Sequence, residues 1–274
     1  MNDLRRNLAP FSADVWSEID GEAARVLKLH LAARKLVDFN GPLGWNTSAI
    51  DIGWTSELKD PPADGVGAFI RLPQPLVELR APFTLMMRDI RAIERGAKDA
   101  DLGPVVDAAK AIARAEDKAV FHGYAAAGII GIAEAAADAT VSLSEDYTRY
   151  PAAVLEATEK LRAAGIDGDY AIALGPRCHA GLHKTLTPAG FPIIEHVRKL
   201  VSGPIVWAPA VDGAVVLSMR GGDFELTVGR DISVGYRYHT ADAVELYLEE
   251  SITFRPLTPE AAVPLVYPRK AGRE

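Results

Sequence analysis

Residues 46–78 are the part of the sequence that most constrains how this chain can fold. SAIDIGWTSEL alternates apolar and polar residues, DPPADG breaks the pattern, and VGAFIRLPQPLVEL resumes it. Because successive side chains of a strand point to opposite faces, the pattern predicts a long hairpin with a proline-rich tip. Its apolar residues are too few to enclose a core, and an isolated two-stranded ribbon is marginally stable in water. The hairpin must therefore lie against another surface, and a neighbouring subunit is a natural candidate.

The rest of the chain mixes helices and strands. Apolar residues at helical spacing predict a helix over residues 12–36, which ends before the Gly- and Pro-containing segment FNGPLGW. Further helices are predicted at 86–95, 104–122, 151–164, 176–186 and 191–202. Residues 170–175 have the pattern of a buried strand, and strands dominate from residue 204 onward. Since there is no regular βαβ period, we expect an α+β fold rather than a doubly wound sheet.

RGGDFELTVGRDISVGYRYH, at residues 220–239, carries a second alternating pattern. The turn-forming residues 229–231 separate its two halves, so the pattern predicts a half-buried hairpin. The apolar positions that share one face are Phe224, Leu226 and Val228 before the turn, and Ile232, Val234, Tyr236 and Tyr238 after it. Alternation alone leaves open whether this face belongs to a core, an active site or a docking surface.

Composition narrows the classes of partner. The 274 residues are 49% hydrophobic and 24% charged, as is typical of globular proteins, and the net charge is −7. An acidic surface repels phosphate backbones, so we expect no nucleic acid as partner. No uncharged apolar run reaches the length of about 18 residues that a membrane span needs, so we expect no membrane partner. The single cysteine, Cys178, excludes an intrachain disulfide and fits a reducing cytoplasm.

The sequence gives only weak evidence for catalytic residues. In PRCHAGLH, His179 and His183 would share one helical face, as two metal ligands require, but Ala180 stands where a zinc protease has glutamate. A metal or thiol site and a plain surface helix are both open, with the surface helix favoured. The acidic pairs Glu116–Asp117 and Glu249–Glu250 are expected to lie on solvated faces. Motifs alone therefore predict no catalytic residue, metal or cofactor.

A set of ordered motifs runs from about residue 4 to about residue 265. It comprises NLAP (7–10), Trp16, Ile19 and Asp20, RKLVD (34–38), GPLGW (41–45), PLVELRAPFTL (75–85), ERG (94–96), EDKAVFHG (116–123), WAPAVDGAVVLSMRGGDFELTVGRDISVGY (207–236) and LYLEESITF (246–254). Single motifs such as ERG are unspecific, whereas the ordered set is highly specific. On these residues the chain resembles the encapsulin shell proteins of family 1, once called linocin-type bacteriocins.

The resemblance implies the Hong Kong 97-type fold of tailed-phage major capsid proteins. That fold has a peripheral domain, an axial domain and an extended loop, and the hairpin then becomes the extended loop, lying across a neighbour. We expect the peripheral domain to comprise residues 1–45, 78–130 and 220–253, the extended loop residues 46–77, and the axial domain residues 131–219 and 254–274, with a polar tail at the end.

The resemblance also implies a function. Such subunits self-assemble, in ~60 copies or a multiple, into an icosahedral nanocompartment in the bacterial cytoplasm. The shell encloses a cargo enzyme, usually a ferritin-like iron oxidase or a dye-decolorising peroxidase, in iron storage or defence against oxidative stress. The cargo's C-terminal peptide docks on the luminal wall, and small solutes pass through pores. The subunit itself is expected to be no enzyme and to hold no cofactor.

The family's functional segments can be carried over residue by residue. The cargo dock maps to Leu27, Leu31, Arg34 and Asp38 on the helix side and to Ile232, Val234 and Tyr236 on the strand side. An extended peptide with alternating apolar residues needs apolar pockets and a charge pair to fix its register; the alternative is that these residues are plain core. The pore loop maps to Thr187, Pro188, Ala189, Gly190 and Phe191. Its tip has no histidine, which favours size selection over gating by pH.

Two other functions remain as alternatives to that of a shell subunit. A phage or prophage capsid subunit would share the fold but would enclose DNA, which the acidic balance disfavours. A hydrolase would use Cys178 with His179 or His183, although no oxyanion or base context accompanies the thiol.

Overall fold

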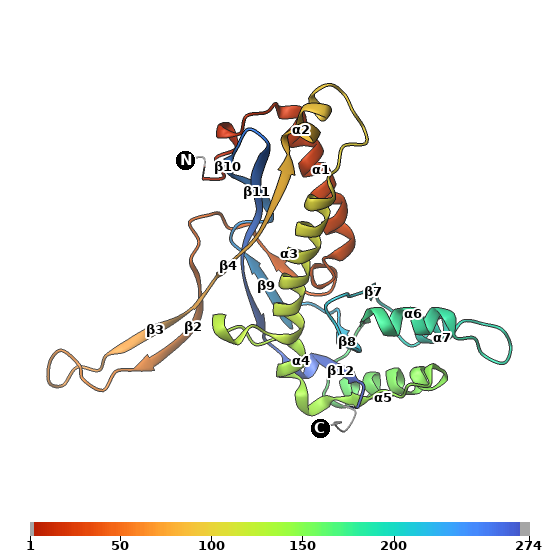
Figure 1. Ribbon diagram of the computed structural model, residues 1–274. Coiled ribbons are helices and arrows are strands. Elements are labelled where there is room, and N and C mark those ends of the chain that lie inside the picture. The colour runs from red at the N-terminus through yellow and green to blue at the C-terminus, as the bar shows by residue number, and fades with distance from the viewer. Residues whose placement is uncertain (1–2, 269–274) are drawn as a thin grey trace, which may run out of the picture.

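The computed structural model describes residues 3–268, which form two five-stranded sheets, a separate two-stranded ribbon and helices packed around them (Figure 1). The first sheet is centred on β11 (Ala243–Pro256), which pairs along one side with β4 (Val77–Met86). Along its other side, β11 pairs with β10 (Ser233–His239) and then with β9 (Phe224–Val228). The short strand β1 (Asp38–Asn40) adds parallel to β9.

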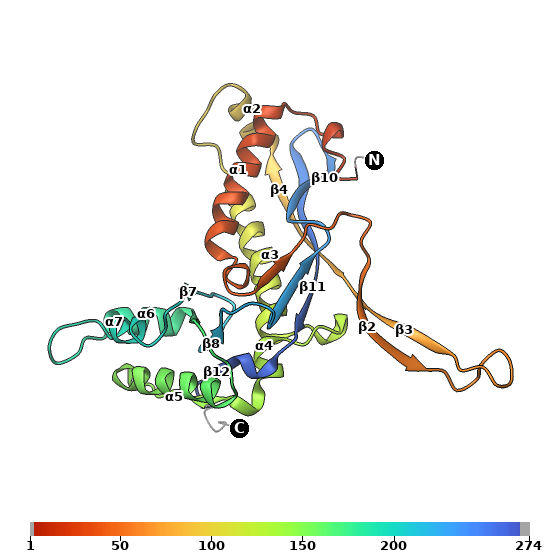
Figure 2. The same cartoon turned by 180° about the vertical axis from the view of Figure 1, so that it is seen from behind.

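Three helices pack against the first sheet: α1 (Ala13–His30), α2 (Met87–Glu94) and α3 (Gly103–His122) (Figure 2). Their buried residues recur every three or four positions, so each helix turns one apolar stripe inward. The stripes of α1 and α3 meet side chains of β4, β10 and β11 in one core cluster, which includes Ile19, Val26, Ile112, Phe83, Val234 and Leu246.

The second sheet has the order β5 (Val141–Ser142), β12 (Ala262–Val266), β8 (Ala214–Ser218), β6 (Tyr170–Leu174) and β7 (Ile205–Trp207). Around it lie α4 (Ile132–Ala135), α5 (Tyr150–Ala163), α6 (Pro176–Lys184) and α7 (Ile193–Arg198).

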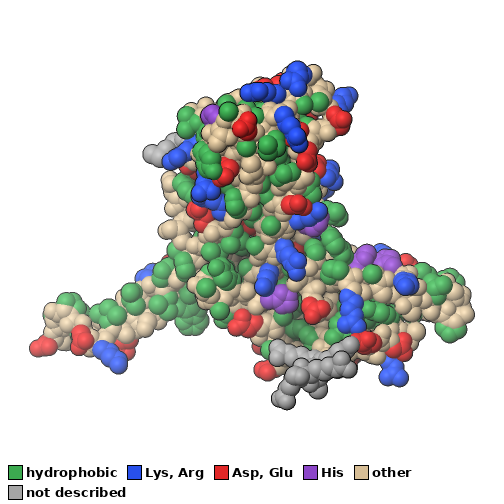
Figure 3. All heavy atoms as spheres, in the orientation of Figure 1, with side chains coloured by type: hydrophobic (Ala, Val, Ile, Leu, Met, Phe, Trp, Pro, Cys, Tyr) green, Lys and Arg blue, Asp and Glu red, His purple; other side chains and the backbone are tan. Residues whose placement is uncertain are grey.

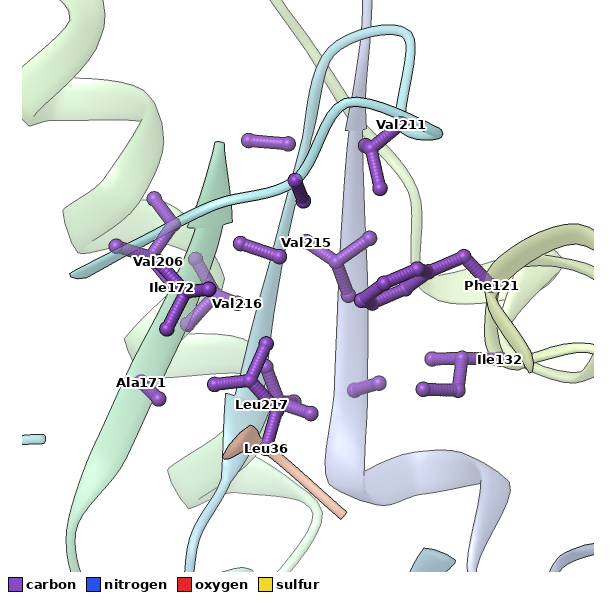
Figure 4. Packing of buried hydrophobic residues seen from close by; sticks show 14 of the residues in the cluster. Leu36, Phe121, Ile132, Ala171, Ile172, Val206, Val211, Val215, Val216 and Leu217 are labelled. Atoms are coloured by element: carbon purple, nitrogen blue, oxygen red, sulfur yellow. The ribbon is translucent and has the colours of Figure 1, made fainter. Parts of the chain in front are cut away.

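Figure 4 shows Phe121 of α3 beside Val215 of β8. The same cluster includes Leu226 and Phe254 of the first sheet, so a continuous core joins the two sheets. Short 3-10 helices occupy Arg6–Leu8, Ala33–Lys35, Ala125–Ala127, Ala137–Ala139, Tyr147–Arg149 and Pro259–Ala261. The mixed order of helices and strands is the predicted α+β arrangement.

The predicted hairpin at residues 46–78 is confirmed as β2 (Ala49–Glu57) paired antiparallel with β3 (Phe69–Pro75). It projects away from the rest of the molecule in both views (Figures 1 and 2). The residues after Pro75 leave the ribbon and enter β4 of the first sheet. Apolar side chains lie exposed along the ribbon, among them Trp54 at 69%, Phe69 at 61% and Ile70 at 51%. Figure 3 shows this apolar surface continuing onto the body where the ribbon begins.

The prediction of a hairpin at residues 220–239 is wrong. β9 and β10 do not pair with each other but follow the same side of β11, one after the other. The ladder continues between them, because Gly229 N–H donates to Ser251 O (2.8 Å) and Ser251 N–H donates to Arg230 O (3.0 Å). From Val228 to Ser233 the chain advances five residues while β11 advances three, from Ile252 to Glu249, so the extra residues form a bulge.

The first helix is shorter than the predicted range 12–36, since α1 ends at His30. The chain then bends through the 3-10 turn Ala33–Lys35. The buried carboxylate of Asp117 on α3 accepts hydrogen bonds from the main-chain N–H groups of Ala32 (3.0 Å) and Ala33 (2.9 Å). Main-chain N–H groups at a bend need hydrogen-bond acceptors. Asp117, which is distant in sequence, therefore stabilises the bend after α1.

Candidate functional site

A groove between α1 and β10 brings together three of the predicted docking residues. Leu27, Ile232 and Val234 line a hollow of about 320 Å³. The α1 side presents Asp20, Ala23, Ala24 and Leu27, spaced so that they share one helical face. The hollow persists because two of these four side chains are only methyl groups. The remaining lining residues are Leu4, Arg6, Ser233 and Leu248.

The other predicted docking residues lie elsewhere. Leu31 follows α1 and is buried, and Tyr236 is buried in the first sheet's core, with its hydroxyl 2.6 Å from His239 Nδ1. Asp38 lies on β1, where its carboxylate accepts a hydrogen bond from Gly222 N–H at 2.6 Å. None of the three is among the residues that line the groove.

Arg34 is occupied by carboxylates of its own chain. Its guanidinium contacts Glu116 on α3 at 2.5 Å, Asp231 in the bulge at 2.7 Å and Glu250 on β11 at 3.2 Å. Burial alone would lower the pKa of Arg34, but its bonds to Glu116 and the charge of Asp231 raise it above the ordinary range. Asp231 also accepts from the N–H of Ile232 at 2.8 Å. Arg34 is therefore joined, through Asp231, to the strand that forms one side of the groove.

Glu250 is fully buried in this ionic cluster, which we define as Arg34, Glu116, Asp231 and Glu250. Burial, followed by the charge of Glu116, raises the pKa of Glu250 well above its usual value. One of its oxygens, Oε1, has no hydrogen-bond partner among residues 3–268. One arginine faces three carboxyl groups, and a buried excess of negative charge is strongly unfavourable. The cluster therefore favours the protonated form of Glu250.

The prediction that the acidic pairs lie on solvated faces is wrong, because Glu116, Asp117, Glu249 and Glu250 are each at most 1% exposed. Burial raises the pKa of Asp117 to about 7, against the lowering effect of its two amide donors. The sequence did contain an indication that these four residues are buried. Glu116 and Asp117 continue the spacing of the buried positions Val105, Ala109 and Ile112 on α3. Glu249 and Glu250 directly follow the apolar run LYL at residues 246–248 of the strand.

The predicted pore loop joins α6 to α7 at the end of an arm that extends from the second sheet (Figure 1). Thr187 N–H donates to Phe191 O (2.8 Å), and Gly190 N–H donates to Thr187 O (2.9 Å). Gly190 has a φ of +82°, which side-chain-bearing residues rarely adopt. Between them, Pro188 and Ala189 form the exposed tip, and Phe191 is 62% exposed.

The Cys178 thiol does not have the surroundings of a nucleophile. It is fully buried and lies 3.3 Å from the hydroxyl of Tyr267. Burial raises its pKa, which keeps the thiol neutral and unreactive. The ring centroids of His179 and His183 lie 4.3 Å apart with the ring planes tilted by 36°. Burial, followed by the charge of His183, lowers the pKa of His179. In residues 3–268, no three His, Cys, Asp or Glu side chains gather as metal ligands. These contacts disfavour the hydrolase hypothesis.

Comparison with known proteins gives consistent matches. Residues 1–253 match the family described as an encapsulating protein for peroxidase. The chain is 54% identical over 270 residues to the type 1 encapsulin shell protein of Rhodospirillum rubrum, covering 97% of this chain and 96% of that protein. It is 47% identical over 265 residues to the type 1 encapsulin shell protein of Rhodococcus erythropolis, covering 97% and 100% respectively.

Solved structures give the fold. The chain matches the virus-like particle from Pyrococcus furiosus with a TM-score of 0.63 at 18% identity, covering 91% of this chain and 98% of that one. It matches a chain of Mycobacterium phage Bobi with a TM-score of 0.59 at 15% identity, covering 88% and 91%. The predicted Hong Kong 97-type capsid fold is confirmed. Across the described residues, no helix has both the length and the apolar character needed to cross a membrane.

Proposed function

The chain belongs to the type 1 encapsulin shell proteins, and from this premise we propose that its shell encloses a cargo protein held by a peptide in the groove between α1 and β10. As a family member with a capsid fold, the chain is a shell subunit that assembles in many copies. The observation that carries the proposal is the groove itself, a hollow beside a strand that is lined mainly by apolar side chains. Such a surface suits an extended peptide with apolar side chains.

Three of the predicted docking residues are proposed to contact the peptide directly, namely Leu27, Ile232 and Val234, because they line the hollow. Leu31 and Tyr236, which are buried and do not line the hollow, would not contact the peptide. Arg34 would act on the groove only through Asp231, since its guanidinium already contacts three carboxylates. Asp38, bonded to Gly222, would act at a distance from the peptide.

The cargo is proposed to be a redox enzyme and to carry the chemistry, while the subunit carries none. The description of the matched family names a peroxidase as the enclosed protein, which supports a dye-decolorising peroxidase; a ferritin-like iron oxidase is the alternative that the family resemblance implies. The cargo peptide is proposed to be C-terminal. Closed icosahedral symmetry gives ~60 copies or a multiple. The cytoplasm is the proposed location.

We propose the domain limits predicted above for the assembled shell. In support, β1, β9 and β10 lie inside the range of the peripheral domain, whereas β4 begins one residue before it at Val77 and β11 continues to Pro256, past the predicted limit at 253. Residues 187–191 would line a pore, because they form an exposed tip at the end of an arm. The end of the predicted polar tail, residues 269–274, lies outside the described residues.

Groove variants test the cargo proposal. Ile232→Asp places a charge in the apolar groove, and Ala24→Phe fills it from an exposed helical position. Both are expected to assemble into shells that lack cargo, because a buried unpaired charge or a steric block removes the docking energy. Purified shells would be examined by sedimentation and by mass spectrometry of the protease-protected protein.

The matched control is Ser17→Phe, which adds the same ring at an exposed position of α1 that does not line the groove. It should retain full cargo. If Ile232→Asp and Ala24→Phe also retain full cargo, the groove is not the dock.

The second candidate function, a nucleic-acid capsid, is favoured by the likeness to the phage chain. Particles of that kind would show nucleic-acid absorbance at 260 nm.

A further inference from the structure

The N-terminal segment Asp3–Leu8 lies along the groove and was not part of the predicted dock. The main-chain oxygen of Leu4 accepts a hydrogen bond from Tyr236 N–H at 2.8 Å. Since the inner side of β10 already pairs with β11, this bond lies on the outer side of β10. The segment therefore occupies the strand edge to which an incoming peptide would otherwise add.

Ion pairs anchor the segment to both sides of the groove. Asp3 pairs with Arg230 in the bulge between β9 and β10. Arg6 pairs with both carboxylate oxygens of Asp20 on α1, at 2.6 and 3.2 Å, and lies over the ring of Trp16 at 4.0 Å. A bidentate pair of this kind fixes geometry as well as charge.

The backbone between these anchors is held in an uncommon conformation. Arg5 has a φ of 51°, the one positive value at a non-glycine residue in the part of the chain that the structure describes. Such a residue persists only where its surroundings determine it. The turn lets Leu4 and Arg6 both line the hollow. The segment is thus held in place by specific contacts and forms one side of the groove.

We propose that Leu4 is a specificity-determining residue for the cargo peptide, and that residues 3–6 form the third wall of the groove. This inference rests on the proposed function. Because the edge of β10 beside Leu4 is taken, the peptide docks as an extended chain through apolar side chains, packed among Leu4, Leu27 and Ile232. It does not pair its main chain with Tyr236.

The test compares Leu4→Ala with Leu8→Ala, which removes the same side chain from an exposed position outside the groove. The protease-protected cargo that each shell retains from its native host is measured relative to shell protein. We expect Leu4→Ala to lower this ratio about threefold or more, because part of the apolar contact is lost, and Leu8→Ala to leave it unchanged. Sedimentation confirms that both variants assemble.

The outcomes separate this inference from the function on which it rests. If Ile232→Asp leaves the cargo ratio unchanged in the same experiment, the proposed dock itself fails. If Ile232→Asp empties the shells but Leu4→Ala behaves like Leu8→Ala, only the third wall is overturned. A rise in cargo with Leu4→Ala would also overturn it, because the segment would then compete with the peptide.

Discussion

Replacing Trp54, Phe69 and Ile70 together by serine is expected to abolish shell assembly while leaving the subunit folded. All three side chains are more than half exposed, on a ribbon that contributes nothing to the two described core clusters. Surface substitutions of this kind change the free energy of unfolding by about 0.5 kcal/mol or less each. A shell that uses the ribbon as an intersubunit contact loses three apolar anchors at every copy, and the loss multiplies over the assembly.

Sedimentation velocity and circular dichroism would measure assembly and folding separately. The matched control places the same number of serines at polar positions of the ribbon tip, Lys59, Asp60 and Asp64, and should still form shells. Shells of normal size from the apolar triple variant would mean that the exposed ribbon is not an assembly contact.

The ribbon could be predicted from the sequence because its evidence is local. Alternation on both sides of DPPADG defines two strands that pair with each other, and the shortage of apolar residues shows that they need an outside surface. The same reasoning failed at residues 220–239. Alternation around residues 229–231 fits a hairpin and a bulged strand equally well, and the deciding partner, β11, comes later in the chain.

The groove was predictable only in part. Leu27 followed from helical spacing, and Ile232 and Val234 from alternation, each together with the family resemblance; the structure places the three together. Leu4 and Arg6 carry no local signal, because ion pairs to Arg230 and Asp20 determine where their segment lies. For Arg34 the sequence pattern shows only a charged residue near the end of the helix predicted over residues 12–36. Its carboxylate partners, of which Glu116 and Glu250 are buried, come from two other elements and from the bulge, so no spacing rule connects them.

Replacing Arg34 by methionine is expected to lower the free energy of unfolding by about 3–5 kcal/mol, because Glu116 and Glu250 then remain buried without their cation. The matched control is Arg71→Met, which breaks an ion pair with Asp51 in which both side chains are exposed. That change should have an effect of about 1 kcal/mol or less. Urea unfolding would be measured in the background of the assembly-deficient triple variant, so that subunits rather than shells are compared.

The loss of unfolding free energy caused by Arg34→Met should grow with pH. The direction of this pH dependence follows from the buried carboxyl groups. The pKa values of Asp117, about 7, and of Glu250 are raised in the folded state by burial. From about pH 4 to pH 7 these two groups bind more protons in the folded state than in the unfolded state, so their contribution to stability falls as pH rises through this window. Because the charge of Arg34 lowers the pKa of Glu250, removing it favours the protonated form further, and the stability of the variant then falls more steeply with pH than that of the parent. Arg34→Met should thus be less destabilising at pH 5 than at pH 8, and adding Glu250→Gln should reduce that difference. A loss that is equal at both pH values, or no greater than that of Arg71→Met, would show that Glu116 and Glu250 do not depend on Arg34 for their burial.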